Sequence, residues 1–239
     1  MSDNPDTSAL RTLTIDIGGT GIKLLPIDNE GQALAERHRE LTPKPSDPDG
    51  VLALIGEMIK AQQPFDRVSV GFPGVVVRGV VRTAPNLGTE AWRGFDLRGA
   101  IAKLSGKPTR VANDAELQGY GVIEGKGVEL VLTLGTGLGT GLYVNGHLVP
   151  NLELAHHPLV KGKTYEDLVR DSERKRVGKK KWRKRVELVF ETLEPIFNYD
   201  ILHVGGGNAK HLKEPLPENV RLFTNVSGMT GGIRLWDDK

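Results

Sequence analysis

The first residues able to carry chemistry are glycines and one carboxylate that follow an apolar stretch. From Asp16 to Lys23 the chain reads Asp-Ile-Gly-Gly-Thr-Gly-Ile-Lys. Glycines let backbone N–H groups face an anion, and a carboxylate at a strand end can hold a hydrated Mg²⁺. A hairpin turn that merely needs positive φ explains the glycines equally well. The residues predicted to bind phosphate and Mg²⁺ here are Asp16, Gly18, Gly19, Thr20 and Lys23.

Two further glycine runs follow apolar stretches later in the chain. Residues 134–141 read Leu-Gly-Thr-Gly-Leu-Gly-Thr-Gly, and residues 205–207 are three consecutive glycines. Neither run has the Lys-Ser or Lys-Thr step of a P-loop or a G-x-G-x-x-G dinucleotide fingerprint. The recurrence nevertheless favours phosphate binding over an isolated turn. The residues predicted from these two runs are Gly135, Thr136, Gly137 and Gly206.

Strand-like and helix-like stretches alternate around these runs, which is typical of an α/β sheet. In the first half we expect strands at 13–17, 22–27, 67–72 and 108–112 and helices at 51–61, 97–104 and 115–124. The second half repeats this pattern, with strands at 128–134, 142–144, 201–204 and 220–223. The chain is therefore predicted to form two lobes built on one plan.

Six short motifs occur in a fixed order between residue 13 and about residue 207. They are Asp16-Ile-Gly-Gly-Thr20, Val70-Gly-Phe-Pro-Gly-Val75, Ala84-Pro-Asn-Leu87, Val111-Ala-Asn-Asp-Ala115, Leu134-Gly-Thr-Gly-Leu-Gly139 and Leu152-Glu-Leu-Ala-His156. Their order and spacing resemble the ROK family (repressors, open reading frames and kinases). The resemblance implies an α/β, two-lobed actin-like ATPase (ribonuclease H-like) fold with the active site in the interlobe cleft. We place the lobes at 1–113 and 114–239, with the C-terminal end either in the second lobe or packed back on the first.

The same resemblance assigns roles to single residues. It makes Asp114 the general base that takes the proton from the sugar 6-hydroxyl. A carboxylate at a strand end, near a helix N-terminus, is suited to staying ionised. Asp114 could also be only the N-cap of the helix that follows, and both roles can coexist. The residues implied to bind the sugar hydroxyls are Asn86, Asn113, Glu153, His156 and Glu166.

Three departures from the family pattern matter. The chain has no Cys, so the family's C-x-C-G-x-x-G-C zinc motif is missing and structural zinc is excluded on thiolate grounds. Ala155 replaces the family's glycine before the histidine, and His157 follows, so the choice of His156 depends on its spacing from Glu153. We expect no helix-turn-helix ahead of Leu13, which removes the repressor branch of the family.

A basic run occupies residues 174–185, with nine cations and no acid in twelve residues. Apolar residues from Trp182 to Phe197 recur at helical spacing, so the second half of the run is predicted to open a helix. Cations in a first helical turn oppose the macrodipole, so something outside the helix must offset that cost. A solvated face is the simplest explanation of such a run.

Within the resemblance, members that lack the zinc motif and keep L-E-L-x-H are similar to the polyphosphate glucokinases, which take phosphate from inorganic polyphosphate and often from ATP. The basic run would then be a track for that polyanion, with affinity that falls steeply with salt. Nucleic acid is the competing polyanion, but Trp182 is the run's one aromatic residue, which argues against a stacking platform. The residues assigned to the track are Lys179, Lys180, Lys181 and Arg183.

Composition sets wider bounds. The 239 residues carry 32 Lys plus Arg against 30 Asp plus Glu, which excludes a globally basic coat for nucleic acid. A chain without cysteine has no disulfide framework and suits the cytoplasm. Residues 1–10 lack the basic and apolar regions of a secretory signal. No apolar run is long enough to cross a membrane, so we expect no membrane partner and no nucleic-acid partner.

The sequence therefore predicts a kinase that transfers a phosphoryl group from polyphosphate, ATP or both to the 6-hydroxyl of glucose, with Mg²⁺ and without zinc. The family resemblance implies a homodimer. Three alternatives stay open. One is an ATP-only kinase for another hexose, such as mannose or N-acetylglucosamine, and another is a non-catalytic protein that binds sugar or polyphosphate. The third is a nucleic-acid binder that uses the basic run at 174–185.

Overall fold

The computed structural model describes residues 10–224 and 230–237, and these divide into two units. The first unit holds residues 10–121 and 230–237, and the second holds residues 122–224. The expectation about a signal segment at residues 1–10 lies, apart from Leu10, outside the described residues. The division falls after residue 121 rather than at 113/114, because helix α4 (Asp114–Tyr120) packs against strands of the first unit.

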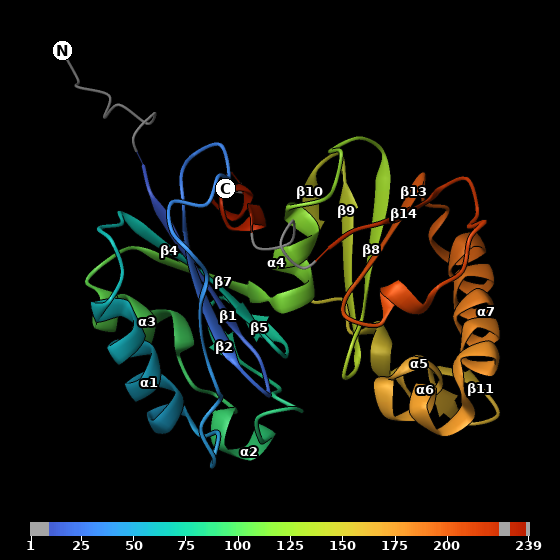
Figure 1. Cartoon of the computed structure of the whole chain (residues 1–239), viewed down its shortest axis with the longest axis horizontal. Helices are drawn as coiled ribbons and strands as arrows, with labels where there is room; N and C mark the ends of the chain where they lie inside the picture. The colour runs from blue at the N-terminus through green and yellow to red at the C-terminus, as the bar shows by residue number, and fades with distance from the viewer. Residues whose placement is uncertain (1–9, 225–229, 238–239) are drawn as a thin grey trace. The chain divides into compact units, whose positions relative to one another are not determined.

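The first unit contains a five-stranded sheet in the order β3-β2-β1-β4-β7 (Figure 1). Its strands are β1 (Thr12–Ile17), β2 (Ile22–Ile27), β3 (His38–Glu40), β4 (Arg67–Phe72) and β7 (Thr109–Asn113). Strands β1, β4 and β7 run parallel, whereas β2 and β3 join as antiparallel neighbours. The carboxyl ends of the three parallel strands therefore meet at one edge, where Asp16 is in register with Gly71 and Phe72 with Asn113.

Helices cover one face of this sheet. They are α1 (Pro48–Lys60), α2 (Thr89–Trp92) and α3 (Leu97–Ser105), and a short hairpin joins β5 (Val76–Val77) to β6 (Val80–Val81). Helix α1 begins where Asp47 caps the N–H of Gly50 and buries Val51, Ile55 and Met58. These side chains join the alternating apolar residues of β1 and β4 in one core.

The C-terminal residues complete the opposite face of the same sheet. They form two 3₁₀ turns, η4 (Thr230–Gly232) and η5 (Arg234–Trp236). The Ser69 hydroxyl donates to the carbonyl of Gly232 at 2.6 Å and accepts from the indole N–H of Trp236 at 2.8 Å. The guanidinium groups of Arg67 and Arg110 lie over the Trp236 ring. The chain end thus belongs to the first unit.

The second unit repeats the plan with a sheet in the order β10-β9-β8-β13-β14. Its strands are β8 (Val128–Leu134), β9 (Leu138–Val144), β10 (His147–Val149), β13 (Ile201–Gly205) and β14 (Val220–Leu222). Strands β8, β9 and β10 are antiparallel neighbours, and β8, β13 and β14 run parallel. Each unit therefore opens with a hairpin whose turn is rich in glycine, as the sequence predicted.

In the second unit the apolar stripe of the long helix α7 joins the core of the sheet, and the shorter helices α5 and α6 contact α7. They are α5 (Tyr165–Val169), α6 (Asp171–Val177) and α7 (Lys179–Phe197), with smaller elements η2 (Leu154–His156), β11 (Pro158–Val160), β12 (Lys163–Thr164) and η3 (Ala209–His211). Helix α7 buries Trp182, Val186 and Val189, and the Trp182 indole donates to the carbonyl of Val169 at 2.7 Å. The predicted helix in the second half of the basic run is confirmed. No helix in the described part of the chain is long and apolar enough to cross a bilayer.

Candidate functional site

The turn between β1 and β2 is held by its own backbone and by side chains packed against it. Gly18 N–H donates to the carbonyl of Gly21 at 3.1 Å. A Cβ at Gly18 would lie 2.8 Å from that carbonyl oxygen, and one at Gly19 would lie 3.1 Å from Cβ of Asn86. None of these glycines has positive φ. The alternative that this hairpin needs glycine for positive φ is wrong, since close approach is the reason.

Two residues predicted for phosphate and Mg²⁺ bind each other in this structure. Asp16 and Lys23 lie opposite one another in the β1–β2 register, and Lys23 Nζ donates to Asp16 Oδ2 at 2.6 Å. Both side chains are mostly buried, with exposed fractions of 16% and 25%. Among the described residues no donor reaches Asp16 Oδ1, so this oxygen stays available to a hydrated cation.

Two side chains from the loop after β3 also contact this turn, and no sequence pattern predicted these contacts. The Thr42 hydroxyl donates to the carbonyl of Gly18 at 2.5 Å, and Lys44 Nζ lies 3.5 Å from the carbonyl of Gly19. Their loop has no periodicity that would place it beside a turn more than twenty residues away. Thr20 is exposed at the tip of the turn.

At the edge where β7 ends, Asn113 and not Asp114 is the N-cap of α4. The Asn113 side-chain oxygen accepts from the N–H of Ala115 at 2.8 Å. In the same capping box, the Asn113 N–H donates to the carboxylate of Glu116. The N-cap alternative for Asp114 is therefore wrong. Asp114 is the first helical residue, half-buried, with Oδ1 accepting from the N–H of Ala115 at 2.9 Å.

The amide of Asn113 is largely engaged within the protein. Its Nδ2 donates to the carbonyl of Gly74 at 3.2 Å while its oxygen caps α4, which leaves one amide N–H for a ligand. Gly71 of β4 faces α4 closely, since a Cβ there would lie 3.4 Å from Cα of Asp114. The first unit thus gathers Asp16, Asn113 and Asp114 at one sheet edge.

The turn between β8 and β9 is open at its first glycine, Gly135, whereas a Cβ at Gly137 would clash with the carboxylate of Glu166. A Cβ at Gly135 would meet no atom within 4 Å, and this residue has no positive φ. Gly207, in the third glycine run, has the same two properties. None of the described residues requires glycine at these two positions. Glycine at these positions would let a ligand approach the backbone N–H groups closely, and the structure leaves the space for it.

The third glycine run packs on the end of β8. Gly206 has a φ of +83°, and a Cβ there would lie 2.5 Å from the carbonyl oxygen of Leu134. Asn208 donates from its backbone to that carbonyl at 2.9 Å and from its side chain to the carbonyl of Gly135 at 3.1 Å. Sequence reasoning missed Asn208, although its place directly after the run could have marked it.

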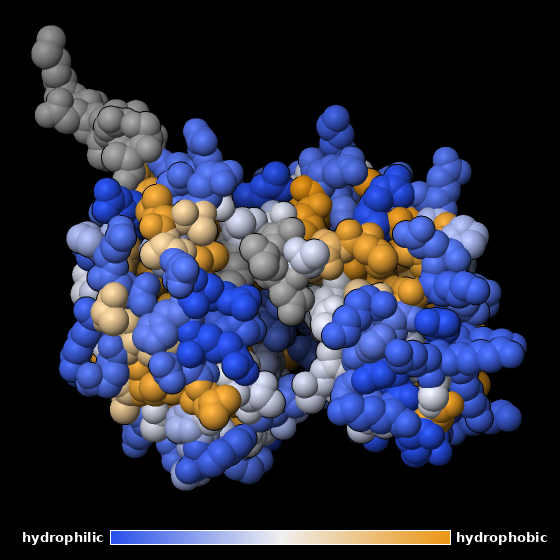
Figure 2. All heavy atoms as spheres, viewed as in Figure 1, coloured by the Kyte–Doolittle hydropathy of each residue, from blue (hydrophilic) through white to orange (hydrophobic). Residues whose placement is uncertain are grey.

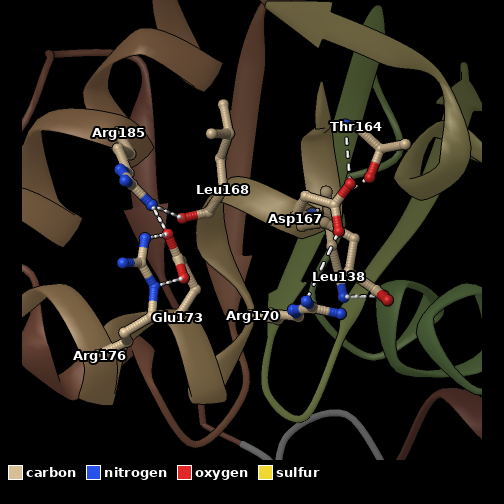
Figure 3. Close-up of polar contacts among 9 residues, drawn as sticks. Leu138, Thr164, Asp167, Leu168, Arg170, Glu173, Arg176 and Arg185 are labelled. Atoms are coloured by element: carbon tan, nitrogen blue, oxygen red, sulfur yellow. Dashed lines mark hydrogen bonds and ion pairs between the residues drawn. The ribbon is translucent and has the colours of Figure 1, made fainter. Parts of the chain in front are cut away.

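The predicted sugar ligands of the second unit fall in two places. His156 Nε2 lies 3.8 Å from Oε2 of Glu153, so the E-x-x-H spacing brings these two side chains together, whereas His157 faces the ring of Tyr165. Glu166 lies against the second glycine turn, where its Oε2 accepts from the N–H of Leu138 at 3.0 Å. Helix α5 is fixed there by a capping box between Thr164 and Asp167, which Figure 3 shows beside Leu138.

Four of the nine cations in the basic run form ion pairs with two acids that precede it, Asp171 and Glu173. Hydrogen bonds from Lys175 and Arg174 lower the pKa of Asp171 to about 2. Those from Arg176 and Arg185 likewise lower the pKa of Glu173 to about 2 (Figure 3). These acids pair with cations of α6 and with Arg185, so the offset expected for the three lysines that begin α7 is not found among the ion pairs of the described residues.

The other half of the run stays available. Lys179, Lys180 and Lys181 are exposed and form no ion pair with an acid among the described residues. Arg183 is half-buried, and its Nε donates to the backbone carbonyl of His211 at 2.6 Å. Figure 2 shows a mainly hydrophilic surface over α6 and the start of α7. Within the described residues, the four residues assigned to a polyanion track and Lys184 are the five cations of the run that have no acidic partner.

Comparison with known proteins identifies the family to which this chain belongs. Residues 12–152 match the sequence profile of the ROK family. The polyphosphate glucokinase of Mycobacterium tuberculosis (strain CDC 1551 / Oshkosh) is 35% identical over 254 aligned positions, which cover 96% of this chain and 95% of that protein. This chain belongs to the ROK family.

Solved structures of ROK proteins agree with this. The inorganic polyphosphate/ATP-glucomannokinase of Arthrobacter sp. strain KM is 32% identical, with a TM-score of 0.83 over 94% of this chain and 97% of that one. The ROK family glucokinase of Streptomyces griseus, solved with glucose and AMPPNP, is 20% identical with a TM-score of 0.73 over 93% and 97%. The fold is the actin-like ATPase fold of these sugar kinases, which confirms the predicted class.

Proposed function

We propose that this protein is a polyphosphate-dependent glucokinase that transfers a phosphoryl group from inorganic polyphosphate, and also from ATP, to the 6-hydroxyl of glucose. The observation that carries the proposal is the 35% identity to a polyphosphate glucokinase over nearly the whole length of both chains. The likeness to a polyphosphate/ATP-glucomannokinase supports both donors. The open glycines and unpaired lysines of the second unit suit a donor that is a polyanion.

In the proposed reaction Asp114 is the general base. Its place in the first turn of α4 favours the ionised carboxylate, which accepts the proton of the glucose 6-hydroxyl. The hydroxyl oxygen then bonds to the terminal phosphorus of the donor, and the phosphoanhydride bond breaks. A shorter polyphosphate or ADP leaves with the electron pair. Asp114 afterwards returns its proton to solvent.

The proposed sugar ligands are Asn86, Asn113, Glu153, His156 and Glu166. Asn86 is exposed, and its Cβ lies against Gly19, so its side chain begins beside the first glycine turn. Asn113 has one N–H left for a hydroxyl, and its cap on α4 also fixes the backbone of Asp114. The Glu153–His156 pair offers an acceptor and a ring nitrogen whose orientation each partner steadies.

The donor phosphates are proposed to bind the two glycine turns. The groups concerned are Gly18, Gly19, Thr20 and Lys23 in the first unit, and Gly135, Thr136, Gly137 and Gly206 in the second. Thr20 and Thr136 are exposed at the tips of their turns, where each hydroxyl can donate to a phosphate oxygen. Lys179, Lys180, Lys181 and Arg183 would attract the rest of a polyphosphate chain.

A Mg²⁺ ion fits Asp16. The described residues contain no group of three or more His, Cys, Asp or Glu that could hold a metal by themselves. Mg²⁺ is commonly held by one or two carboxylates together with water and substrate phosphates, and Oδ1 of Asp16 is such a carboxylate oxygen. When bound, Mg²⁺ would neutralise charge on the donor phosphates. Lys23 would share Asp16 with the ion or move to a phosphate.

The test of the mechanism is an Asp114→Asn variant, which keeps the shape of the side chain and removes the base. Asp49→Asn is the matched control, because Asp49 also lies in the first turn of a helix in the same unit. We expect Asp114→Asn to lose turnover with both donors by at least about a hundredfold and to bind glucose nearly as the wild type does. A near-normal rate in this variant would contradict the role of Asp114.

Mannose is a second acceptor that one observation favours, since the Arthrobacter relative is named a glucomannokinase. A panel of glucose, mannose and N-acetylglucosamine with each donor would rank the acceptors. We also propose a homodimer, which light scattering on the purified protein measures directly. The location in the cytoplasm, expected from the cysteine-free composition, stays a prediction.

A further inference from the structure

The two flanks and the outer face of α7 present its cations in different directions. Trp182 and Val186 face the core and define an apolar stripe along α7. Because the helix has 3.6 residues per turn, the residues on the two sides of this stripe form its two flanks. Lys179 and Arg183 share one flank, and Arg183 contacts the backbone of His211 in η3. Arg185 lies on the other flank with Glu173. Lys180, Lys181 and Lys184 are exposed on the outer face.

Element η3 adds two groups to the flank of Lys179 and Arg183. Lys210 is exposed and His211 is half-buried. Burial lowers the pKa of His211, and the positive charges of Arg174, Lys179, Lys210 and Arg183 lower it further. Of the acids around this cluster, Asp171 is already bonded to Arg174, and Glu187 follows Arg183 by one turn of α7 and lines a pocket together with it. Cations from α6, α7 and η3 therefore converge on one imidazole.

This cluster is joined to the second glycine turn by hydrogen bonds. The carbonyl of Gly135 accepts from the backbone N–H of Asp171 at 3.1 Å and from Nδ2 of Asn208 at 3.1 Å. Asp171 begins α6, and Asn208 directly precedes η3. The elements that carry the cations are thus anchored to the turn whose Gly135 faces open space.

We propose that Lys179, Arg183, Lys210 and His211 form a subsite for the phosphate groups of polyphosphate that lie beyond the transferred one, and that His211 takes up a proton when the polyanion binds. The inference rests on the proposed function and assigns direct phosphate contacts to fewer residues of the predicted polyphosphate track. Lys180 and Lys181 lie on the outer face of α7 and add only a general electrostatic attraction for the polyanion. Lys210 and His211 were not part of the sequence prediction.

The proton uptake follows from linkage. In the free protein burial and the surrounding cations both disfavour imidazolium, so the pKa of His211 lies below its usual value. A bound polyanion screens those cations and supplies acceptor oxygens, which raises the pKa of His211. Affinity for polyphosphate then gains a contribution that is present at lower pH and is lost as pH rises through the pKa of the complex.

The first test compares two double variants that remove equal charge. Lys179→Ala/Lys210→Ala changes the subsite, and Lys180→Ala/Lys181→Ala is the matched control on the same helix. We expect the KM for linear polyphosphate to rise about tenfold or more in the first and less than about threefold in the second, with a shallower salt dependence in the first. KM and kcat with ATP should change little in either. Equal effects of the two pairs on polyphosphate would overturn the subsite.

The second test measures proton uptake directly. Linear polyphosphate is titrated calorimetrically into the protein without glucose, near neutral pH, in two buffers with different ionisation enthalpies. The wild type should take up a fraction of a proton that His211→Gln lacks, and this difference removes any contribution from the polyphosphate ends. Equal proton uptake by both proteins would overturn the role of His211. A wild type that phosphorylates glucose from ATP alone would instead contradict the proposed donor.

Discussion

The two glycine turns occupy equivalent places in the two sheets, yet their surroundings differ. The β1–β2 turn is packed by Asn86, Thr42 and Lys44, and the Asp16–Lys23 ion pair closes its base. In the β8–β9 turn, Asn208 and Asp171 both donate hydrogen bonds to the carbonyl of Gly135. The Cα of Gly135, by contrast, faces open space. One turn is set up to position a cation beside the base Asp114, and the other to receive an anion. Equivalent topology therefore does not mean equivalent chemistry.

The largest expected effect concerns the support of the second turn. Gly206→Ala would place a Cβ 2.5 Å from the carbonyl oxygen of Leu134 at a φ of +83°. We expect a loss of about 2–4 kcal/mol in the free energy of unfolding, measured by urea denaturation. Gly207→Ala is the control, since it has room and no positive φ, and should stay within about 0.5 kcal/mol. Similar stability of the two variants would show that the packing of Gly206 on Leu134 does not stabilise the β8–β9 turn.

The next effect separates the two turns by function. Gly135→Ala has room for its Cβ, so stability should change by less than about 0.5 kcal/mol while the KM for either phosphoryl donor rises about tenfold. Gly19→Ala would press on Asn86 and should lose about 1 kcal/mol of stability. If Gly135→Ala left the donor KM unchanged, the open turn would have no role in binding anions.

The positions of the two turns could be predicted from the sequence, but the difference between their surroundings could not. Placing both turns at strand ends followed from alternating apolar residues, and the pairing of Asp16 with Lys23 could have been read from the hairpin register. The capping by Asn113 could not, because Asn and Asp are equally good caps and the helix start differs by one residue. Contacts such as Asn208 with Gly135 join residues 73 positions apart, and no local pattern encodes them.

A smaller effect on stability is expected at the two acids that form ion pairs with four cations of the basic run. Glu173→Gln removes the partner of Arg176 and Arg185, and we expect a loss of about 1 kcal/mol at neutral pH. Because the pKa of Glu173 is lowered to about 2, this contribution is present above about pH 4.5 and is lost as pH falls toward 2. Urea denaturation at several pH values measures it. A difference from wild type that stayed constant down to acid pH would contradict the ion pair.

The smallest effect concerns the ion pair at the base of the first turn. A double-mutant cycle with Asp16→Asn and Lys23→Gln should give a coupling of about 0.5–1 kcal/mol in stability, since both side chains are mostly buried but near the surface. Zero coupling would mean that the pair is not formed in solution. The contrast between a filled and an open turn would then weaken.

The most direct test of the central claim is the initial rate of glucose phosphorylation by the wild type with linear polyphosphate and, separately, with ATP, each with Mg²⁺. The account predicts turnover with polyphosphate, with a KM that rises steeply with salt because the donor is bound by lysines that have no acidic partner. Turnover with ATP and none with polyphosphate would contradict it. The chain would then be a ROK sugar kinase whose basic helix has another use.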